Sequence, residues 1–190
     1  MKDIIKQFKN NSDGVRVIML IHRSKEGGLN NKFKRHLKKI ITTNSDEFFE
    51  TIKELKELKD KDERTLRIYA SCNNRSMKKA IRLFKEKQLN SDYDENEKID
   101  NFYLDIKNRF ISSLMNKSCR NEKNFLFDLD DIDDRSLKTI YKMIDKRTEI
   151  LNFYNTKNGY HIITKPFNYK DLDEEVIKSI NTDGLMLIDY

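Results

Sequence analysis

The 190-residue sequence has few of the residues that build disulfide frameworks, zinc sites and membrane spans. Its two cysteines, Cys72 and Cys119, are far apart and lack the spacing of metal ligands, which excludes a cysteine-based scaffold. No apolar run approaches the ~20 residues of a membrane-spanning helix, and the charged N-terminus is unlike a signal peptide. With one proline and no low-complexity linker, we expect a single domain in a reducing, cytoplasmic compartment with no membrane partner.

The composition is polar but typical of a folded chain. Hydrophobic and charged residues each make up 37%, and aromatic residues reach 10%, which is enough for a buried core. The net charge is +6, so nucleic acid is a plausible partner. The abundance of Lys, Asn and Ile throughout weakens that argument, because it also fits a general compositional bias.

The first 123 residues predict an N-terminal α/β lobe. Strands are expected at 15–22, 33–43 and 66–71, and helices at 45–58, 77–87 and 100–115. The basic, glycine-containing loop 22–28 could approach phosphates through its backbone, or it could be an ordinary turn. The segment 91–98 is acidic and is predicted to be a loop.

Arg75 lies in a polar turn between a predicted strand and a predicted helix. Free N–H groups at a helix N-terminus favour anions, so the turn Cys72–Ser76 could bind phosphate. The alternative is that Asn74 or Ser76 caps the helix and that Arg75 points into solvent.

The last third predicts a β-α-β-β-α-β unit. Strands are expected at about 124–129, 149–155, 160–165 and 185–188, helices at 135–146 and 172–180, and a tight hairpin turn at Asn158-Gly159. This order is that of the ferredoxin-like or RRM-like fold, with the strands arranged 4-1-3-2. We therefore expect an α+β protein in which residues 124–190 form an RRM-like or ferredoxin-like subdomain, with its core at about 124–189.

Two carboxylates end the first strand of this unit. Because side chains alternate across a strand, Asp128 and Asp130 should share one face with Leu126. The opposite face is expected to be apolar and buried: Phe125, Phe127 and Leu129. Two adjacent carboxylates repel each other, and a Mg²⁺ or Mn²⁺ ion between them would relieve that repulsion. Alternatively, the acidic run 128–134 is a solvated turn that caps the next helix.

The predicted sheet brings further polar side chains to Asp128 and Asp130. The start of the third strand, with His161, should lie beside the end of the first. The start of the fourth strand, preceded by Asp183, should lie on its other side. The sequence therefore predicts that Asp128, Asp130, Asp183 and His161 gather on one open face of the sheet.

These motifs resemble those of the archaeo-eukaryotic primase superfamily, the primase-polymerases, and small phage-type members in particular. The resemblance covers about 124–189: the strand that ends in Asp128-Leu-Asp130, the element Thr156-Lys-Asn-Gly-Tyr-His161, and a late acid, Asp183 or Asp189. The run 67–75 resembles the N-terminal lobe of phage members more loosely.

The resemblance implies a metal-dependent nucleotidyltransferase. Asp128, Asp130 and Asp183, with Asp189 as the alternative third acid, would be catalytic and hold Mg²⁺ or Mn²⁺. His161 would bind the phosphates of the incoming nucleotide. Lys157, Lys165 and Arg75 are further candidates for phosphate contacts. The partners would be nucleotides and single-stranded nucleic acid, in a bacterial or phage-infected cell. No zinc-binding or helical accessory module follows the final strand, so a replication partner protein is also expected.

Three other functions remain open from the sequence. The first is an RRM-type module that binds nucleic acid without catalysis, which would need aromatic side chains on the open sheet face. The second is a phosphohydrolase with Asp128 as nucleophile, which would need a parallel sheet. The third is a phage interaction protein built on a degenerate primase-like fold.

Overall fold

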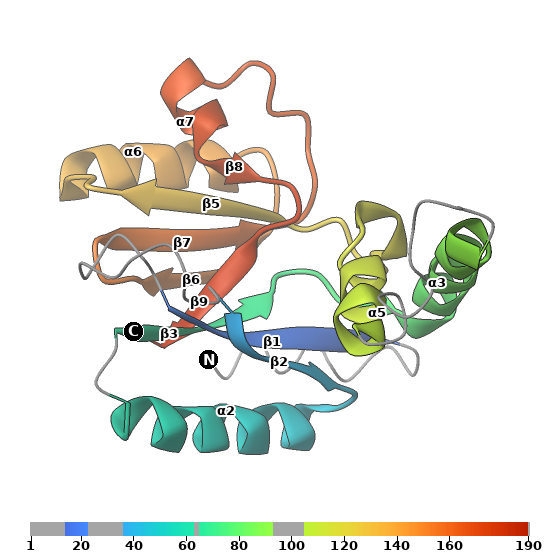
Figure 1. Ribbon diagram of the computed structural model, residues 1–190. Coiled ribbons are helices and arrows are strands. Elements are labelled where there is room, and N and C mark those ends of the chain that lie inside the picture. Colours follow the sequence, from blue (N-terminus) through green and yellow to red (C-terminus); the bar gives the residue numbers. More distant parts are fainter. Residues whose placement is uncertain (1–13, 23–35, 63–64, 93–104, 190) are drawn as a thin grey trace.

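The computed structural model describes residues 14–22, 36–62, 65–92 and 105–189. Within these ranges the protein is an α+β structure with two antiparallel sheets flanked by helices (Figure 1). The helices are α2 (Ser45–Asp60), α3 (Met77–Asp92), α5 (Ile106–Leu114), α6 (Asp134–Asp145) and α7 (Glu174–Lys178), with a 3₁₀ turn, η3, at Lys117–Cys119. None of the helices described is long and apolar enough to span a bilayer.

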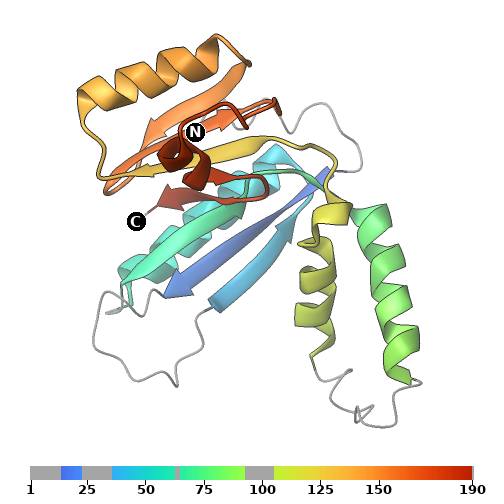
Figure 2. The ribbon, with the colours of Figure 1, turned by 90° about the horizontal axis from the view of Figure 1, so that it is seen from above.

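The first sheet is built around a fully buried strand. Its strands are ordered β2-β1-β3-β9, and a short strand, β4, also pairs with β1. Their bounds are β1 Gly14–His22, β2 His36–Thr42, β3 Leu66–Ser71, β4 Arg75–Ser76 and β9 Leu185–Asp189. Helix α2 packs on one face of this sheet and α3 with α5 on the other, which explains why β1 is apolar on both sides. Helices α3 and α5 lie side by side and extend beyond one end of the sheet (Figure 2).

The second sheet has the strand order β6-β7-β5-β8, with all neighbours antiparallel. Its strands are β5 Phe125–Asp130, β6 Ile150–Asn155, β7 Gly159–Thr164 and β8 Ile180–Asn181. Helices α6 and α7 cover the face that carries Phe125, Phe127 and Leu129. On the other face, Leu126 and Ile163 pack into the core of the first sheet, so the two sheets share one apolar core.

The predicted position of the last strand is wrong. The segment 185–188 was expected to pair with β5, but β9 pairs with β3 in the first sheet, and the two-residue strand β8 occupies the place beside β5. The apolar side chains Met186 and Leu187 are buried in the β3–β9 region. A strand's own sequence shows that it will be buried but does not identify its partner.

Side-chain caps begin α2 and α6, and the cap of α6 comes from the acidic run 128–134, as one interpretation of the sequence held. The Asn44 side chain accepts a hydrogen bond from the Glu47 N–H (2.8 Å), and Asp133 caps α6 by accepting from the N–H groups of Arg135 and Ser136. The hydrogen bonds from Ser136 lower the pKa of Asp133. The loop 23–28, most of the acidic segment 91–98 and the first part of the predicted helix at 100–104 lie outside the described residues.

A buried ion pair connects the β3–α3 corner to the entry of β9. The Arg75 side chain is fully buried, and its two terminal nitrogens, Nη1 and Nη2, donate to Asp183 Oδ2 (2.9 Å) and Oδ1 (2.6 Å). Nη1 also lies 3.4 Å from the carbonyls of Met115 and Asn116. Such a bidentate pair is strong and geometrically specific. Arg75 therefore joins three segments: the start of α3, the end of α5 and the start of β9.

Two further buried side chains, Asn73 and Arg16, make polar contacts at the same corner, and those of Asn73 connect the first sheet to the start of β5. Asn73 donates to the Asn124 carbonyl (3.1 Å) and accepts from the Asn124 N–H (2.7 Å), as a backbone partner in a sheet would. Buried Arg16 donates to the carbonyls of Ser71 and Cys72 at 2.6 and 2.7 Å. These contacts hold the chain where it leaves one sheet and enters the other.

We predict that Asp183→Ala is strongly destabilising. It removes the anion that neutralises the buried Arg75 guanidinium, and breaking a buried ion pair in this way costs roughly 3–5 kcal/mol. The matched control is Glu149→Ala, which breaks the exposed Lys165–Glu149 pair, both of whose side chains are more than half exposed. That loss should be below about 1 kcal/mol. Urea unfolding of both variants checks the prediction, and equal losses would contradict it.

Candidate functional site

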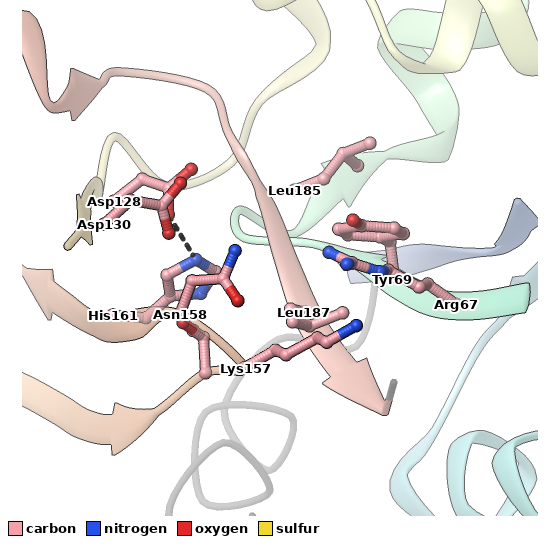
Figure 3. A pocket seen from close by; sticks show the side chains of 10 residues that line it. Arg67, Tyr69, Asp128, Asp130, Lys157, Asn158, His161, Leu185 and Leu187 are labelled. Carbon is pink, nitrogen blue, oxygen red and sulfur yellow. Dashed lines mark hydrogen bonds and ion pairs between the residues drawn. The ribbon is translucent and has the colours of Figure 1, made fainter. Parts of the chain in front are cut away.

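A polar pocket lies between the second sheet and the β3–β9 edge of the first (Figure 3). One wall is formed by the end of β5, the start of β7 and the β6–β7 turn. The other wall is formed by β3 and β9. The residues that line it are Arg67, Tyr69, Asp128, Asp130, Thr156, Lys157, Asn158, His161, Leu185 and Leu187.

Asp128 and Asp130 are adjacent in this pocket, as the strand alternation predicted. Both lie on the face of β5 opposite its apolar side chains, and both are exposed. In the register with β7, Asp128 is paired with His161 and Asp130 with Gly159. Figure 3 shows the two carboxylates close together above His161. The end of β5 therefore offers two carboxylates from one strand to one cavity.

His161 is held at both ring nitrogens. Nε2 lies 2.9 Å from Asp128 Oδ1, and Nδ1 lies 2.9 Å from the hydroxyl of Tyr154 on β6. The imidazole side chain is only 5% exposed, whereas Asp128 is 45% exposed. His161 is thus a rigid, buried neighbour of an accessible carboxylate.

Gly159 allows the hairpin to approach β5. A Cβ at this position would lie 1.9 Å from the Leu129 carbonyl oxygen, so no side chain fits there. The predicted hairpin is present, but its turn lies one residue earlier than expected, because Gly159 is already the first residue of β7 and the Thr156 N–H bonds to its carbonyl. The glycine serves close packing beside Asp130 rather than the turn itself.

The wall formed by β3 and β9 was not predicted. Arg67 and Tyr69 come from β3 and share a face because they are two residues apart, and Leu185 and Leu187 come from β9. The Arg67 residue is 4% exposed. The alternation in Leu66-Arg-Ile-Tyr69 indicates an arginine on one sheet face, but nothing in that segment shows which other strand it meets.

The structure brings some predicted site residues together and separates others. Lys157 lines the pocket with Asp128, Asp130 and His161. Lys165 pairs with Glu149 on the surface. Arg75 and Asp183 pair with each other and are not among the pocket-lining residues, so Arg75 is neither solvated nor facing this pocket. Asp183 departs from the predicted convergence because β9 pairs with β3.

Asp189, the alternative third acid, also lies elsewhere. Its carboxylate contacts the amines of Lys56 (2.8 Å) and Lys59 (2.6 Å) on α2. Partial burial acts to raise the pKa of Asp189, but the hydrogen bonds from the two lysines together outweigh it and lower that pKa. Asp189 therefore anchors the end of β9 to α2.

The donor set suits a metal that is shared with a ligand. Among the described residues, no three His, Cys, Asp or Glu side chains are grouped so that they could hold a metal ion by themselves. Mg²⁺ is commonly bound by one or two carboxylates together with water and substrate phosphates. Asp128 and Asp130 fit that mode of binding, since both are accessible hard oxygen donors.

Comparisons with known proteins add no assignment. No protein-family model matches the chain, and neither the curated proteins nor the solved structures contain a significant match.

We predict that Gly159→Ala destabilises the fold and distorts the pocket. The new methyl group would meet the Leu129 backbone, which cannot rotate away, and overpacking of this kind costs roughly 1–3 kcal/mol. Asn158→Ala, at the neighbouring turn position, should cost less than about 0.5 kcal/mol, because it keeps the carbonyl that accepts from the Asp131 N–H. Thermal unfolding compares the two, and a stable Gly159→Ala protein would refute the close-packing role.

Proposed function

We propose that this protein is a metal-dependent nucleotidyltransferase of the primase-polymerase type. The observation that carries the proposal is one pocket in which two accessible carboxylates from a single strand, Asp128 and Asp130, lie on the same wall as a histidine and a lysine and across from an arginine. Phosphoryl transfer requires charge neutralisation and positioning more than covalent chemistry by the protein. The carboxylates of this pocket would hold a metal ion that neutralises charge, and its cationic side chains would position the phosphates.

Asp128 and Asp130 would hold Mg²⁺ or Mn²⁺. A divalent ion bound there would neutralise phosphate charge and favour deprotonation of an attacking hydroxyl. The two carboxylates are close together on the face of β5 that lines the pocket. That proximity supports a shared ion, since it would offset their mutual repulsion.

Arg67 and Lys157 would bind the phosphates of the nucleotide. They lie on different walls of the pocket, Arg67 on β3 and Lys157 in the β6–β7 turn. Arg67 is almost fully buried and Lys157 is exposed. An arginine fork in a partly enclosed pocket suits phosphate oxygens, and the more mobile lysine suits the part of the ligand nearer to solvent. Arg67 takes the phosphate-binding role that the sequence suggested for Arg75.

The β5–β8 sheet supports the primase-like interpretation through its element order. The segment from β5 to β8 follows the β-α-β-β-α-β order, and its strands are arranged β6-β7-β5-β8. The acids end its first strand and His161 lies in its third. The departure is that β8 is very short and that the longer strand after it joins the other sheet.

The other functions considered from the sequence have less support. An RRM-type module would stack bases on exposed aromatic rings, but Phe125 and Phe127 are buried under α6 and α7. A phosphohydrolase with Asp128 as nucleophile would need a parallel sheet, and both neighbours of β5 are antiparallel to it. An interaction protein remains the outcome to accept if the catalytic test below fails.

The test is incorporation of labelled nucleotides on single-stranded DNA with Mg²⁺ or Mn²⁺. The wild-type chain should give product, and the Asp128→Asn, Asp130→Asn double variant should give none, because the substitutions keep side-chain size but remove both metal-binding charges. Chelation of the metal should abolish the wild-type product as well.

The matched control is Asp145→Asn, which removes one carboxylate at the far end of α6, outside the pocket. It should retain wild-type incorporation. Product from the double variant at the wild-type rate would overturn the proposal. The proposal would also be overturned if the wild-type chain gave no product and bound neither metal nor nucleotide.

A further inference from the structure

A chain of two hydrogen bonds links a tyrosine to the candidate metal-binding carboxylate. The Tyr154 hydroxyl is 2.9 Å from His161 Nδ1, and His161 Nε2 is 2.9 Å from Asp128 Oδ1. The three residues lie on adjacent strands, β6, β7 and β5, and in register. The sequence alone does not single out Tyr154, because its contact with His161 exists only when β6 and β7 pair.

The chemistry of the end groups decides where the ring proton lies. A carboxylate only accepts hydrogen bonds, so the contact to Asp128 favours a proton on His161 Nε2, and a donor at Nδ1 adds to that preference. In a neutral imidazole the other nitrogen, Nδ1, then has a lone pair and must accept. The tyrosine supplies that donor, since burial raises the pKa of the Tyr154 phenol and keeps it protonated.

We infer that Tyr154 is a positioning residue that acts on Asp128 through His161. Its hydroxyl holds the imidazole in the Nε2–H tautomer and fixes the ring so that Nε2–H donates to Asp128 Oδ1. We call this chain of two hydrogen bonds, Tyr154–His161–Asp128, the relay. Its importance for catalysis rests on the proposed function, whereas the two hydrogen bonds are present whatever the function. Hydrogen bonds of this kind behind a metal-site residue usually fix both its tautomer and its orientation.

The relay limits what His161 can do for a ligand. Nδ1 is occupied by Tyr154, so a phosphate can reach this ring only through the Nε2 proton that Asp128 also uses. The other charged groups that line this pocket are Asp130, Arg67 and Lys157. They line the pocket, whereas Tyr154 does not line it and packs against the shared core of the two sheets.

The direct test is the nitrogen NMR spectrum of His161. The chain has three histidines, so labelling with ¹⁵N-histidine gives a simple spectrum, and His161→Gln assigns the signals. With metal removed by a chelator, and at a pH at which the spectrum shows a neutral imidazole, the wild-type protein should show an unprotonated Nδ1 and a protonated Nε2. In Tyr154→Phe the ¹⁵N chemical shifts of Nδ1 and Nε2 should both move toward the values averaged over the two tautomers. A proton on Nδ1 in the wild type, or an unchanged pattern in Tyr154→Phe, would overturn the inference.

The matched control is Tyr160→Phe. Tyr160 is the neighbour of His161 on β7 but points to the other face, where its hydroxyl lies 3.5 Å from Asp134. This variant loses the same single oxygen and should leave the His161 spectrum as in the wild type. A shift in Tyr160→Phe equal to that in Tyr154→Phe would mean that the effect is general loosening of the sheet, and would also overturn the inference.

The catalytic consequence is measured separately. In the nucleotide-incorporation assay, Tyr154→Phe should lower kcat about 10-fold, with a smaller change in KM, because Asp128 is less well oriented. An unchanged kcat with altered tautomer signals would refute the positioning role in catalysis. If the wild-type chain incorporates no nucleotide and binds neither metal nor nucleotide, the proposed function fails, and the NMR result still decides whether Tyr154 sets the tautomer.

Discussion

The buried ion pair between Arg75 and Asp183 is the contact on which the rest of the structure depends. A guanidinium with no exposed surface is tolerated only when an anion and further acceptors surround it. Here the anion comes from a segment 108 residues away, just before β9. Once Asp183 pairs with Arg75, the chain that follows it is directed to the edge of β3 and away from the second sheet. The pairing of β9 with β3 defines the architecture.

The pocket is a consequence of that connection. Because β9 joins β3, the face of β5 that carries the acids does not stay open but meets a second wall. That wall contributes the buried cation Arg67 opposite Asp128 and Asp130. The backbone-like pairing of Asn73 with Asn124 holds the start of β5 at the same corner. The chain thus uses buried polar contacts at one end of the sheets to set the geometry of a polar pocket at the other.

The sequence predicted what depends on neighbours along the chain. The strand β5, the helix α6 capped from the acidic run 128–134, the hairpin, and the position of His161 beside the end of β5 follow from alternation, capping and strand order, and the structure has all of them, with the hairpin turn one residue earlier than expected. It could not predict the partner of 185–189, because an apolar strand suits either sheet. Asp183 was expected beside the acids because the last strand was placed next to β5. Arg75 was expected to bind phosphate because it lies in a strand-to-helix turn, and the structure pairs these two residues with each other outside the pocket. Arg67 and Tyr154 were missed because the residues that they face lie on other strands.

The most direct test of the central claim is a crystal structure of the protein with Mn²⁺ and a nucleoside triphosphate that cannot be hydrolysed, with the metal located by its anomalous scattering. The account predicts an anomalous peak within coordination distance of both Asp128 and Asp130, with the triphosphate directed toward Arg67 and Lys157. Saturating Mn²⁺ and nucleotide with no peak at these carboxylates, or with the nucleotide bound elsewhere, would contradict it.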